Sequence, residues 1–197
     1  SAVAGAADEI RMIHSPESYA PFSVRTVASN GNVWDGKEDR SSISRMPSTE
    51  ELMEIGKGKG CVAENILSIA HHFRYGEFDW FTGGDCQYIR RDQFDYLDIE
   101  APIAEVMGKV DGMKAGHHST KGTNSSELLD VLKPDFVIAG TWKDIHPNHA
   151  TAKRFFKASP DIKFYATNLT DGAKTILSEN GVDWTRFAGT QGHVVVK

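Results

Sequence analysis

Three short segments of the sequence carry side chains that could do chemistry. Asp85 follows two glycines, and His117 and His118 form a pair further along the chain. In the third segment, His146 stands directly before a proline. Carboxylate oxygens and neutral imidazole nitrogens are common ligands of zinc, and imidazole also serves as a general acid or base. The segments predict a metal-dependent or acid–base site, provided that the fold brings them together.

Each segment also has a non-catalytic explanation. Aspartate often caps a turn, and taken alone Asp85 is better explained in this way. A histidine at a helix entry often makes only a local hydrogen bond, which would account for His146, while His149 is expected on the helix and could face the same side. The dipeptide His71-His72 lies within an expected strand, where its two side chains point to opposite faces, so we assign it a structural role.

The elements expected around these segments alternate between strands and helices, which predicts a mixed α/β fold. Apolar or alternating stretches predict strands at residues 23–28, 33–34, 65–75, 78–82, 112–115, 136–139, 163–166, 174–177 and 193–196. Capping residues and apolar spacing predict helices at residues 48–55, 101–109, 124–132 and 147–157, and an exposed loop is expected at residues 35–46. Each chemical segment then lies in a loop just past a strand, where a rigid backbone can hold a side chain in open space.

Composition excludes some classes of protein. The chain has 197 residues, 40% of them hydrophobic and 25% charged, which suits one globular domain or slightly more. The net charge of −5 argues against a basic surface that coats nucleic acid, although a nuclease remains open because bound metal ions bring their own positive charge. No apolar run is long enough to span a bilayer, so no transmembrane segment is predicted.

Two further features are less informative. Cys61 and Cys86 cannot form a disulfide framework, and both a single bridge and two free thiols remain open. Cys86 is expected to be buried. The glycine-rich residues 56–60 suggest a phosphate loop, but they lack the Gly-Lys-Ser/Thr ending and a following helix, which argues against a nucleotide-binding domain.

The three chemical segments occur in a fixed order: Gly-Asp at the end of an expected hairpin, Gly-His-His-Ser about one helix later, and His-Pro after the next strand. This ordered set resembles the metallo-β-lactamase superfamily, in particular its branch related to competence (DNA-uptake) proteins and phosphorylcholine esterases. Members of that branch show Thr-Gly-Asp, His-His-Gly-Ser and Gly-His-Pro in this order. Asn65 and Ser68 match the Asn and Ser that open the preceding strand, and the resemblance covers roughly residues 24–157.

The resemblance implies roles for individual residues. Asp85 matches the aspartate that bridges two metal ions, and His146 matches the last metal-ligand histidine. His117 and His118 match a pair that lines the site, where they are expected to contact the substrate's phosphate or a metal. The substrate-binding groups that it implies are Asn65, Ser119, Thr120, Lys121 and Asn124.

One part of the family pattern is absent. The main ligand cluster, His-x-His-x-Asp-His or its variant with Asp, belongs in the N-terminal half, and here His14 alone precedes His71. Two metal ions need about six or seven protein ligands, of which this chain supplies about three. We therefore expect residues 1–197 to form a single partial domain, the C-terminal half of a metallo-β-lactamase αββα sandwich, with the N-terminal metal-binding half absent.

The function that the resemblance implies is metal-dependent hydrolysis of phosphoester or other ester bonds by a metal-activated water. Two zinc ions are expected in the intact domain, with weak or no activity in this chain by itself. The expected partners are a small-molecule or phosphoester substrate and the missing N-terminal half, with nucleic acid by family analogy only. The alternative is a non-catalytic α/β binding module with a degenerate metal site and structural histidines.

Overall fold

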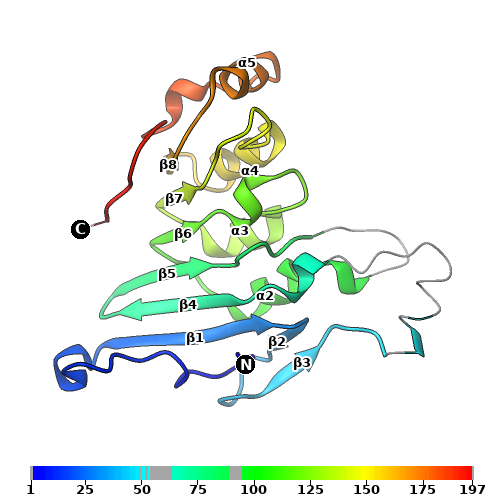
Figure 1. The fold of residues 1–197 in the computed structure, drawn as a ribbon, viewed down its shortest axis with the longest axis vertical. Coiled ribbons are helices and arrows are strands. Elements are labelled where there is room, and N and C mark those ends of the chain that lie inside the picture. Colours follow the sequence, from blue (N-terminus) through cyan, green and yellow to red (C-terminus); the bar gives the residue numbers. More distant parts are fainter. Residues whose placement is uncertain (1, 49, 52, 54–63, 89–94, 197) are drawn as a thin grey trace.

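The computed structural model describes residues 2–48, 50–51, 53, 64–88 and 95–196. Within them the chain forms one eight-stranded sheet of order β3-β2-β1-β4-β5-β6-β7-β8 (Figure 1). The strands are β1 (Phe22–Ser29), β2 (Asn32–Trp34), β3 (Ser42–Ser44), β4 (Ala70–Tyr75), β5 (Phe78–Thr82), β6 (Gly112–Lys114), β7 (Phe136–Ala139) and β8 (Lys163–Ala166). The α-helices are α2 (Glu100–Val106), α3 (Ser126–Leu132), α4 (His149–Ala158) and α5 (Asp171–Glu179). The short 3₁₀ helices are η1 (Pro16–Tyr19), η2 (Glu64–Leu67), η3 (Asp95–Leu97), η4 (Gly116–Ser119) and η5 (Trp184–Arg186).

The sheet is mixed, and its parallel half positions the chemical segments. Strands β1 to β5 pair with one another in antiparallel fashion. Strands β5, β6, β7 and β8 run parallel to one another. Helices α2, α3 and α4 connect successive parallel strands, as parallel pairing requires. The carboxyl ends of β5, β6 and β7 therefore meet at one edge, to which the arrow of β5 points in Figure 1. Strand β4 begins at the same edge because it is antiparallel to β5.

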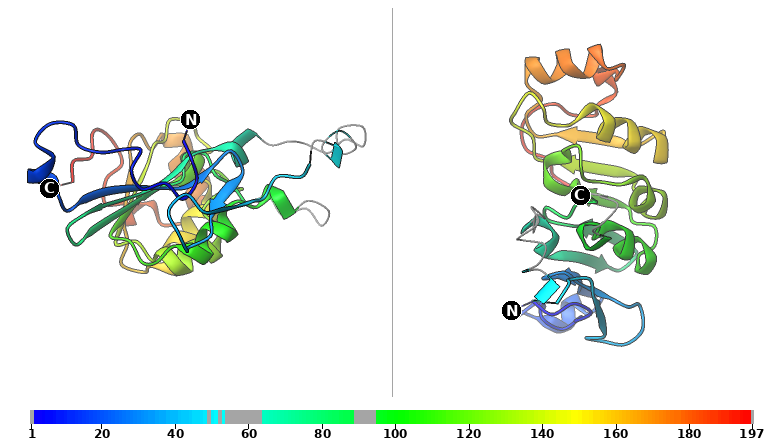
Figure 2. Two further views of the ribbon diagram at one scale, coloured as in Figure 1. Left: turned by 90° about the horizontal axis from the view of Figure 1, so that it is seen from below. Right: turned by 90° about the vertical axis from the view of Figure 1, so that its right-hand side faces the viewer.

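The hydrophobic core lies between the sheet and the helices. Helices α2, α3 and α4 cover one face of the sheet (Figure 2). On that face Phe81, Met113, Val137 and Phe164 stand side by side across β5 to β8, and each is at most 2% exposed. The helices contribute side chains such as the fully buried Phe155 to the same cluster. Burial of this apolar layer holds the parallel strands in register.

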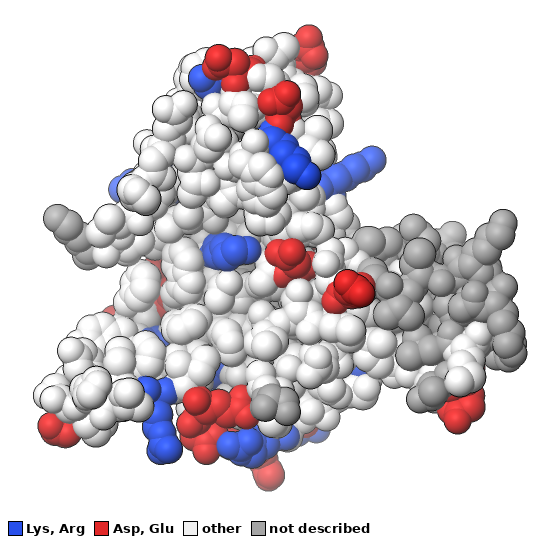
Figure 3. Space-filling view, in the orientation of Figure 1, with Lys and Arg blue, Asp and Glu red and all other residues white. Residues whose placement is uncertain are grey.

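The opposite face of the sheet is apolar and is not covered by a helix in the described part of the chain. Trp80 and Phe136 flank Gly112 across this face, with ring centroids 5.6 Å apart, and a Cβ at Gly112 would collide with the Phe136 ring. Tyr75 and Phe78, on the same face, are 51% and 37% exposed. Figure 3 views this face and shows few charged side chains over β4 to β7.

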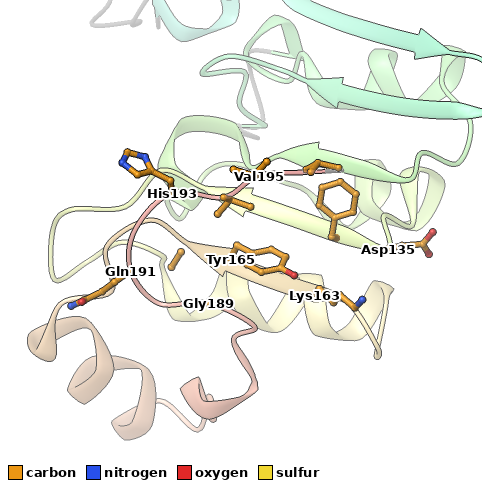
Figure 4. A pocket seen from close by; sticks show the side chains of 11 residues that line it. Asp135, Lys163, Tyr165, Gly189, Gln191, His193 and Val195 are labelled. Carbon is orange, nitrogen blue, oxygen red and sulfur yellow. The ribbon is translucent and has the colours of Figure 1, made fainter.

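The C-terminal residues cross one part of the open face. After residues 187–192 pair beside β8, residues 193–196 pass over β7 and β8 (Figure 4). They enclose a pocket of about 570 Å³ with Phe136 and Tyr165 on its sheet side. None of the site residues predicted from the sequence lines this pocket. In the part of the chain that the structure describes, no helix has the length and apolar character needed to span a lipid bilayer.

Most expected elements are confirmed, and a mixed α/β fold is confirmed with them. The capping box at Ser48 is also present, since the backbone N–H of Ser48 donates to Glu51 Oε2 at 2.8 Å and that of Glu51 donates to Ser48 Oγ at 3.2 Å. The rest of that expected helix, the glycine-rich residues 56–60 and Cys61 lie outside the described residues.

Four expectations are wrong. Residues 65–69 precede strand β4 instead of belonging to it, and residues 64–67 form η2. Residues 174–177 belong to helix α5, which Thr170 caps and whose Ala173 and Leu177, four residues apart, face the core. Residues 193–196 form no strand because they cross the sheet face instead of pairing with its edge. The expected loop at residues 35–46 contains the short exposed strand β3.

Candidate functional site

The three chemical segments come together at the carboxyl ends of β5, β6 and β7. Asp85 follows β5, His117 and His118 lie in η4 after β6, and His146 follows β7. Backbone hydrogen bonds join the loops: the N–H of His117 donates to the Gly84 carbonyl at 3.1 Å. Loops at this edge of parallel strands are a common place for ligand sites in α/β proteins.

The imidazoles of His117, His118 and His146 form one cluster. The ring of His118 lies 5.8 Å from that of His117 and 5.4 Å from that of His146, centroid to centroid. Trp142 packs against two of them in a T-shaped arrangement, with its ring centroid 4.1 Å from that of His118 and 5.0 Å from that of His146. The tryptophan therefore restricts both rings, although it is itself 49% exposed.

The histidine pair is held in an uncommon backbone conformation. His117, His118 and Ser119 have φ values of 40°, 57° and 61°, in the left-handed region that non-glycine residues seldom occupy. Asn124 secures the start of this loop, because its Oδ1 accepts from the Gly116 N–H at 2.8 Å and its Nδ2 donates to the Gly116 carbonyl at 3.2 Å. Backbone strain of this kind persists only where surrounding contacts enforce it, and it concentrates at functional sites.

A network of buried hydrogen bonds lies beneath the loop. Glu100 is 1% exposed and accepts hydrogen bonds from the N–H groups of Asn124 and Ser125 at 2.7 and 2.6 Å. Burial raises the pKa of Glu100 to about 7, although these two N–H groups oppose the shift. Arg154 on α4 binds the other side of the same segment, donating to the carbonyls of Asn124 and Thr123, each at 2.8 Å.

Each imidazole has a distinct hydrogen-bonding situation. The Nδ1 atom of His117 lies 3.0 Å from Asn65 Nδ2, and that of His118 lies 2.9 Å from the carbonyl oxygen of Gly140. The Nδ1 atom of His146 is buried, and no group among the described residues hydrogen-bonds to it.

The surroundings of His146 keep it neutral at neutral pH. Burial lowers the pKa of His146, and the nearby His118, Lys143 and His117 lower it further. A neutral imidazole with an unpaired nitrogen is the form that binds a metal ion.

Asp85 is half-buried and is tied to the strand-β4 side of the site. Its backbone N–H donates to Ser68 Oγ at 3.2 Å, which explains why residues 65–69 do not continue strand β4. Lys114 Nζ donates to the Gly84 carbonyl at 3.1 Å, directly beside it. Burial lowers the pKa of Lys114, while the charge of Asp85 opposes that shift.

The donor atoms fit zinc in kind but not in number. Imidazole nitrogen and carboxylate oxygen are zinc ligands, and the orphaned nitrogen of His146 is suited to one coordination position. Within the described ranges, however, no group of three or more His, Cys, Asp or Glu side chains is arranged to hold a metal ion. A complete metal site would require donors beyond these residues.

The predicted substrate-binding residues divide into two groups. Lys121 is exposed and Thr120 is half-buried, so both side chains are at least partly accessible. Asn124 and Ser119 are at most 1% exposed, so their side chains are buried and not on the rim. Asn65 is half-buried, and its amide is already used by His117.

The histidines expected to be structural behave accordingly. His72 Nε2 bonds Asp79 Oδ1 at 2.7 Å on one face of the sheet, and His71 Nδ1 lies 3.4 Å from Thr26 Oγ1 on the other. His149 is the first residue of α4. Cys86 is buried as expected, and burial raises the pKa of its thiol.

Three site residues were missed from the sequence: Trp142, Gly140 and Gln87. An aromatic residue in the loop after β7 was a usable signal for Trp142, because loops at this edge line the site. No sequence signal marks the Gly140 carbonyl, which acts through its backbone alone. Gln87 has a buried amide whose Oε1 accepts from Asn65 Nδ2 at 3.3 Å.

Comparison with known proteins adds no family to this description. No protein-family model matches the sequence. No curated protein matches it either.

Proposed function

We propose that the chain is part of a metal-dependent hydrolase that acts on phosphoester or other ester bonds. The observation that carries the proposal is the cluster of three imidazoles at the ends of parallel strands, with a buried and unpaired nitrogen on His146. Among the described residues, no protein group hydrogen-bonds to this buried nitrogen. Such a group is better explained by a ligand than by a structural role.

The architecture supports a partial domain. We infer that the chain is the C-terminal half of a metallo-β-lactamase αββα sandwich, with one helical layer and one sheet present. The apolar face that carries Trp80 and Phe136 would then be the surface on which the second sheet packs. The exposure of Tyr75 and Phe78 supports this, because a face of this composition is normally buried.

Zinc is the metal that the donor set favours. Asp85 and His146 would provide part of its ligands, and the N-terminal half would provide the others. When bound, zinc would act as a Lewis acid that polarises the ester and lowers the pKa of a water molecule.

The chain's own side chains would orient the substrate. Lys121, which is exposed, and the hydroxyl of the half-buried Thr120 would hydrogen-bond an anionic group of the substrate. Trp142 would exclude water from one side of the imidazoles and keep their rings in place.

Zinc binding by the chain tests the proposal. We expect weak or single binding of zinc, measured by atomic emission after equilibrium dialysis, and loss of that binding in His146→Ala and Asp85→Ala. His193→Ala is the matched control because His193 is exposed and lies outside the cluster. Zinc-dependent hydrolysis of a generic phosphodiester should be slight in the chain alone. Zinc binding that is unchanged in both site variants would contradict the proposal.

The second candidate is a non-catalytic α/β binding module. It is favoured by the absence, among the described residues, of a group of three or more side chains placed to hold a metal. This candidate predicts no zinc binding and equal free energies of unfolding for the wild type and both site variants.

A further inference from the structure

The two adjacent histidines of the cluster are held by partners of opposite hydrogen-bonding character. His118 Nδ1 faces the carbonyl oxygen of Gly140 at 2.9 Å, and a carbonyl oxygen can only accept a hydrogen bond. His117 Nδ1 faces the amide nitrogen Nδ2 of Asn65 at 3.0 Å, and an amide nitrogen can only donate.

These partners determine where each neutral ring carries its proton. His118 must be protonated on Nδ1 to donate to Gly140, so its Nε2 has a free lone pair. His117 must accept on Nδ1, so its proton is on Nε2. The side-chain amide of Asn65 is itself oriented by Gln87, whose Oε1 accepts from the same Nδ2 at 3.3 Å. Two neighbouring residues of one type therefore present the same atom, Nε2, in opposite states: as an N–H donor on His117 and as a free lone pair on His118.

We propose that Asn65 and the Gly140 carbonyl fix His117 and His118 as opposite tautomers, so that His117 donates to an oxyanion while Nε2 of His118 keeps a free lone pair. The oxyanion is a phosphoryl or carboxyl oxygen of the substrate, and this assignment rests on the proposed hydrolase function. Asn65 is then a positioning residue that acts through His117, in place of the substrate-binding role that the sequence suggested.

The backbone of the loop fixes the positions of the two histidine rings, and so supports the assignment of their tautomers. The left-handed backbone conformation of both histidines, stabilised by Asn124 beneath them, holds their rings at an interplanar angle of 67°. The ring of His118 lies nearly parallel to that of His146, at 21°, and Trp142 packs against both in a T-shaped arrangement. His118 is therefore held beside His146, whose buried Nδ1 has no hydrogen-bond partner among the described residues.

Histidine tautomers can be read directly by NMR. Two-bond ¹H–¹⁵N correlations of the ring protons distinguish the protonated from the unprotonated ring nitrogen, at a pH where the imidazoles are neutral. Signals are assigned with His117→Gln and His118→Gln. We expect the Nε2–H pattern for His117 and the Nδ1–H pattern for His118. The same tautomer in both residues, or a mixture in either, would overturn the proposal.

Asn65→Asp tests whether Asn65 sets the tautomer. The substitution keeps the shape of the side chain but replaces the donor by an acceptor, so His117 should switch to the Nδ1–H pattern while His118 is unchanged. Asn180→Asp, at the C-terminal end of α5, is the matched control and should change neither ring. If His117 keeps its wild-type pattern in a folded Asn65→Asp protein, Asn65 does not position it.

Titration with zinc alone and with inorganic phosphate alone tests the roles. Zinc should perturb Nε2 of His118 and leave His117 unaffected at first, whereas phosphate should perturb the Nε2–H of His117. The reverse order would overturn the assignment of roles. A complete lack of zinc binding would contradict the proposed hydrolase, whereas the tautomers would still be decided by the spectrum of the unliganded protein.

Discussion

Glu100 is the titratable residue on which the histidine loop rests, and it makes the stability of the fold depend on pH. Its pKa is raised to about 7 from an ordinary value of 4.5, mainly by burial. The folded protein therefore holds this proton more tightly than the unfolded chain does. The free energy of unfolding should fall as pH rises from about 4.5 to about 7, by up to about 3 kcal/mol from this group.

Urea denaturation across this pH range checks the prediction. Glu100→Gln should flatten the decrease in the free energy of unfolding with pH, because the side chain can no longer ionise. The variant should also lose some stability, because a glutamine amide accepts hydrogen bonds from the N–H groups of Asn124 and Ser125 less well than a carboxyl group does. Glu105→Gln is the matched control, since Glu105 is exposed on the same helix, and it should retain the decrease. An equally steep decrease in the Glu100 variant would show that another group is responsible.

At this scale the sequence predicted the proximity of the histidine segments but not the roles of their neighbours. Three loops following three parallel strands had to meet, whatever their side chains. Asn124 was expected at the rim, yet its amide closes the loop on Gly116 and is buried. The residue type alone cannot distinguish an asparagine that binds a substrate from one that binds the backbone, because its amide forms the same kinds of hydrogen bond in both cases.

Helix α4 is the element that fixes the histidine loop from behind. Arg154, half-buried on this helix, donates to the carbonyls of Thr123 and Asn124. Arg154→Met keeps the length of the side chain but leaves these carbonyls without their donor, which should cost about 1–3 kcal/mol. We expect faster amide hydrogen exchange in residues 116–124.

The matched control for this prediction is Lys153→Met, because Lys153 is exposed on the same helix. Its exchange in residues 116–124 should equal that of the wild type. Unchanged exchange in Arg154→Met as well would mean that Asn124 and Glu100 hold the loop without help from α4.

Elements were predictable where local signals agreed with tertiary contacts. Ser125 and Asn148 cap α3 and α4 with their side chains, and strand β7 has the expected bounds. Residues 174–177 were misassigned because a segment of four residues that ends in Ile176 and Leu177 is too short to distinguish a strand from a helix. Residues 65–69 were misassigned because the side chains of Asn65 and Ser68 hydrogen-bond to residues of the site, and this segment does not pair with a neighbouring strand.

At the scale of the whole molecule, the most notable feature is that the two faces of the sheet differ in how far their apolar side chains are covered. One face of the sheet is covered by helices, whereas the other presents aromatic side chains from β4, β5 and β7. The sequence predicted a mixed α/β fold in which strands alternate with helices. It could not predict that only one face would be covered, because this depends on which other elements are present.

The open face should bind apolar molecules when the chain is alone. We expect 1-anilinonaphthalene-8-sulfonate to fluoresce with the folded protein, and Tyr75→Lys combined with Phe78→Lys to reduce that signal. Because both side chains are substantially exposed, the double variant should retain the wild-type free energy of unfolding within about 1 kcal/mol. Ile43→Lys, on the exposed strand β3, is the matched control and should leave dye binding intact. Equal dye binding by the double variant would mean that this face is not the accessible apolar surface, and the half-sandwich interpretation would lose its structural support.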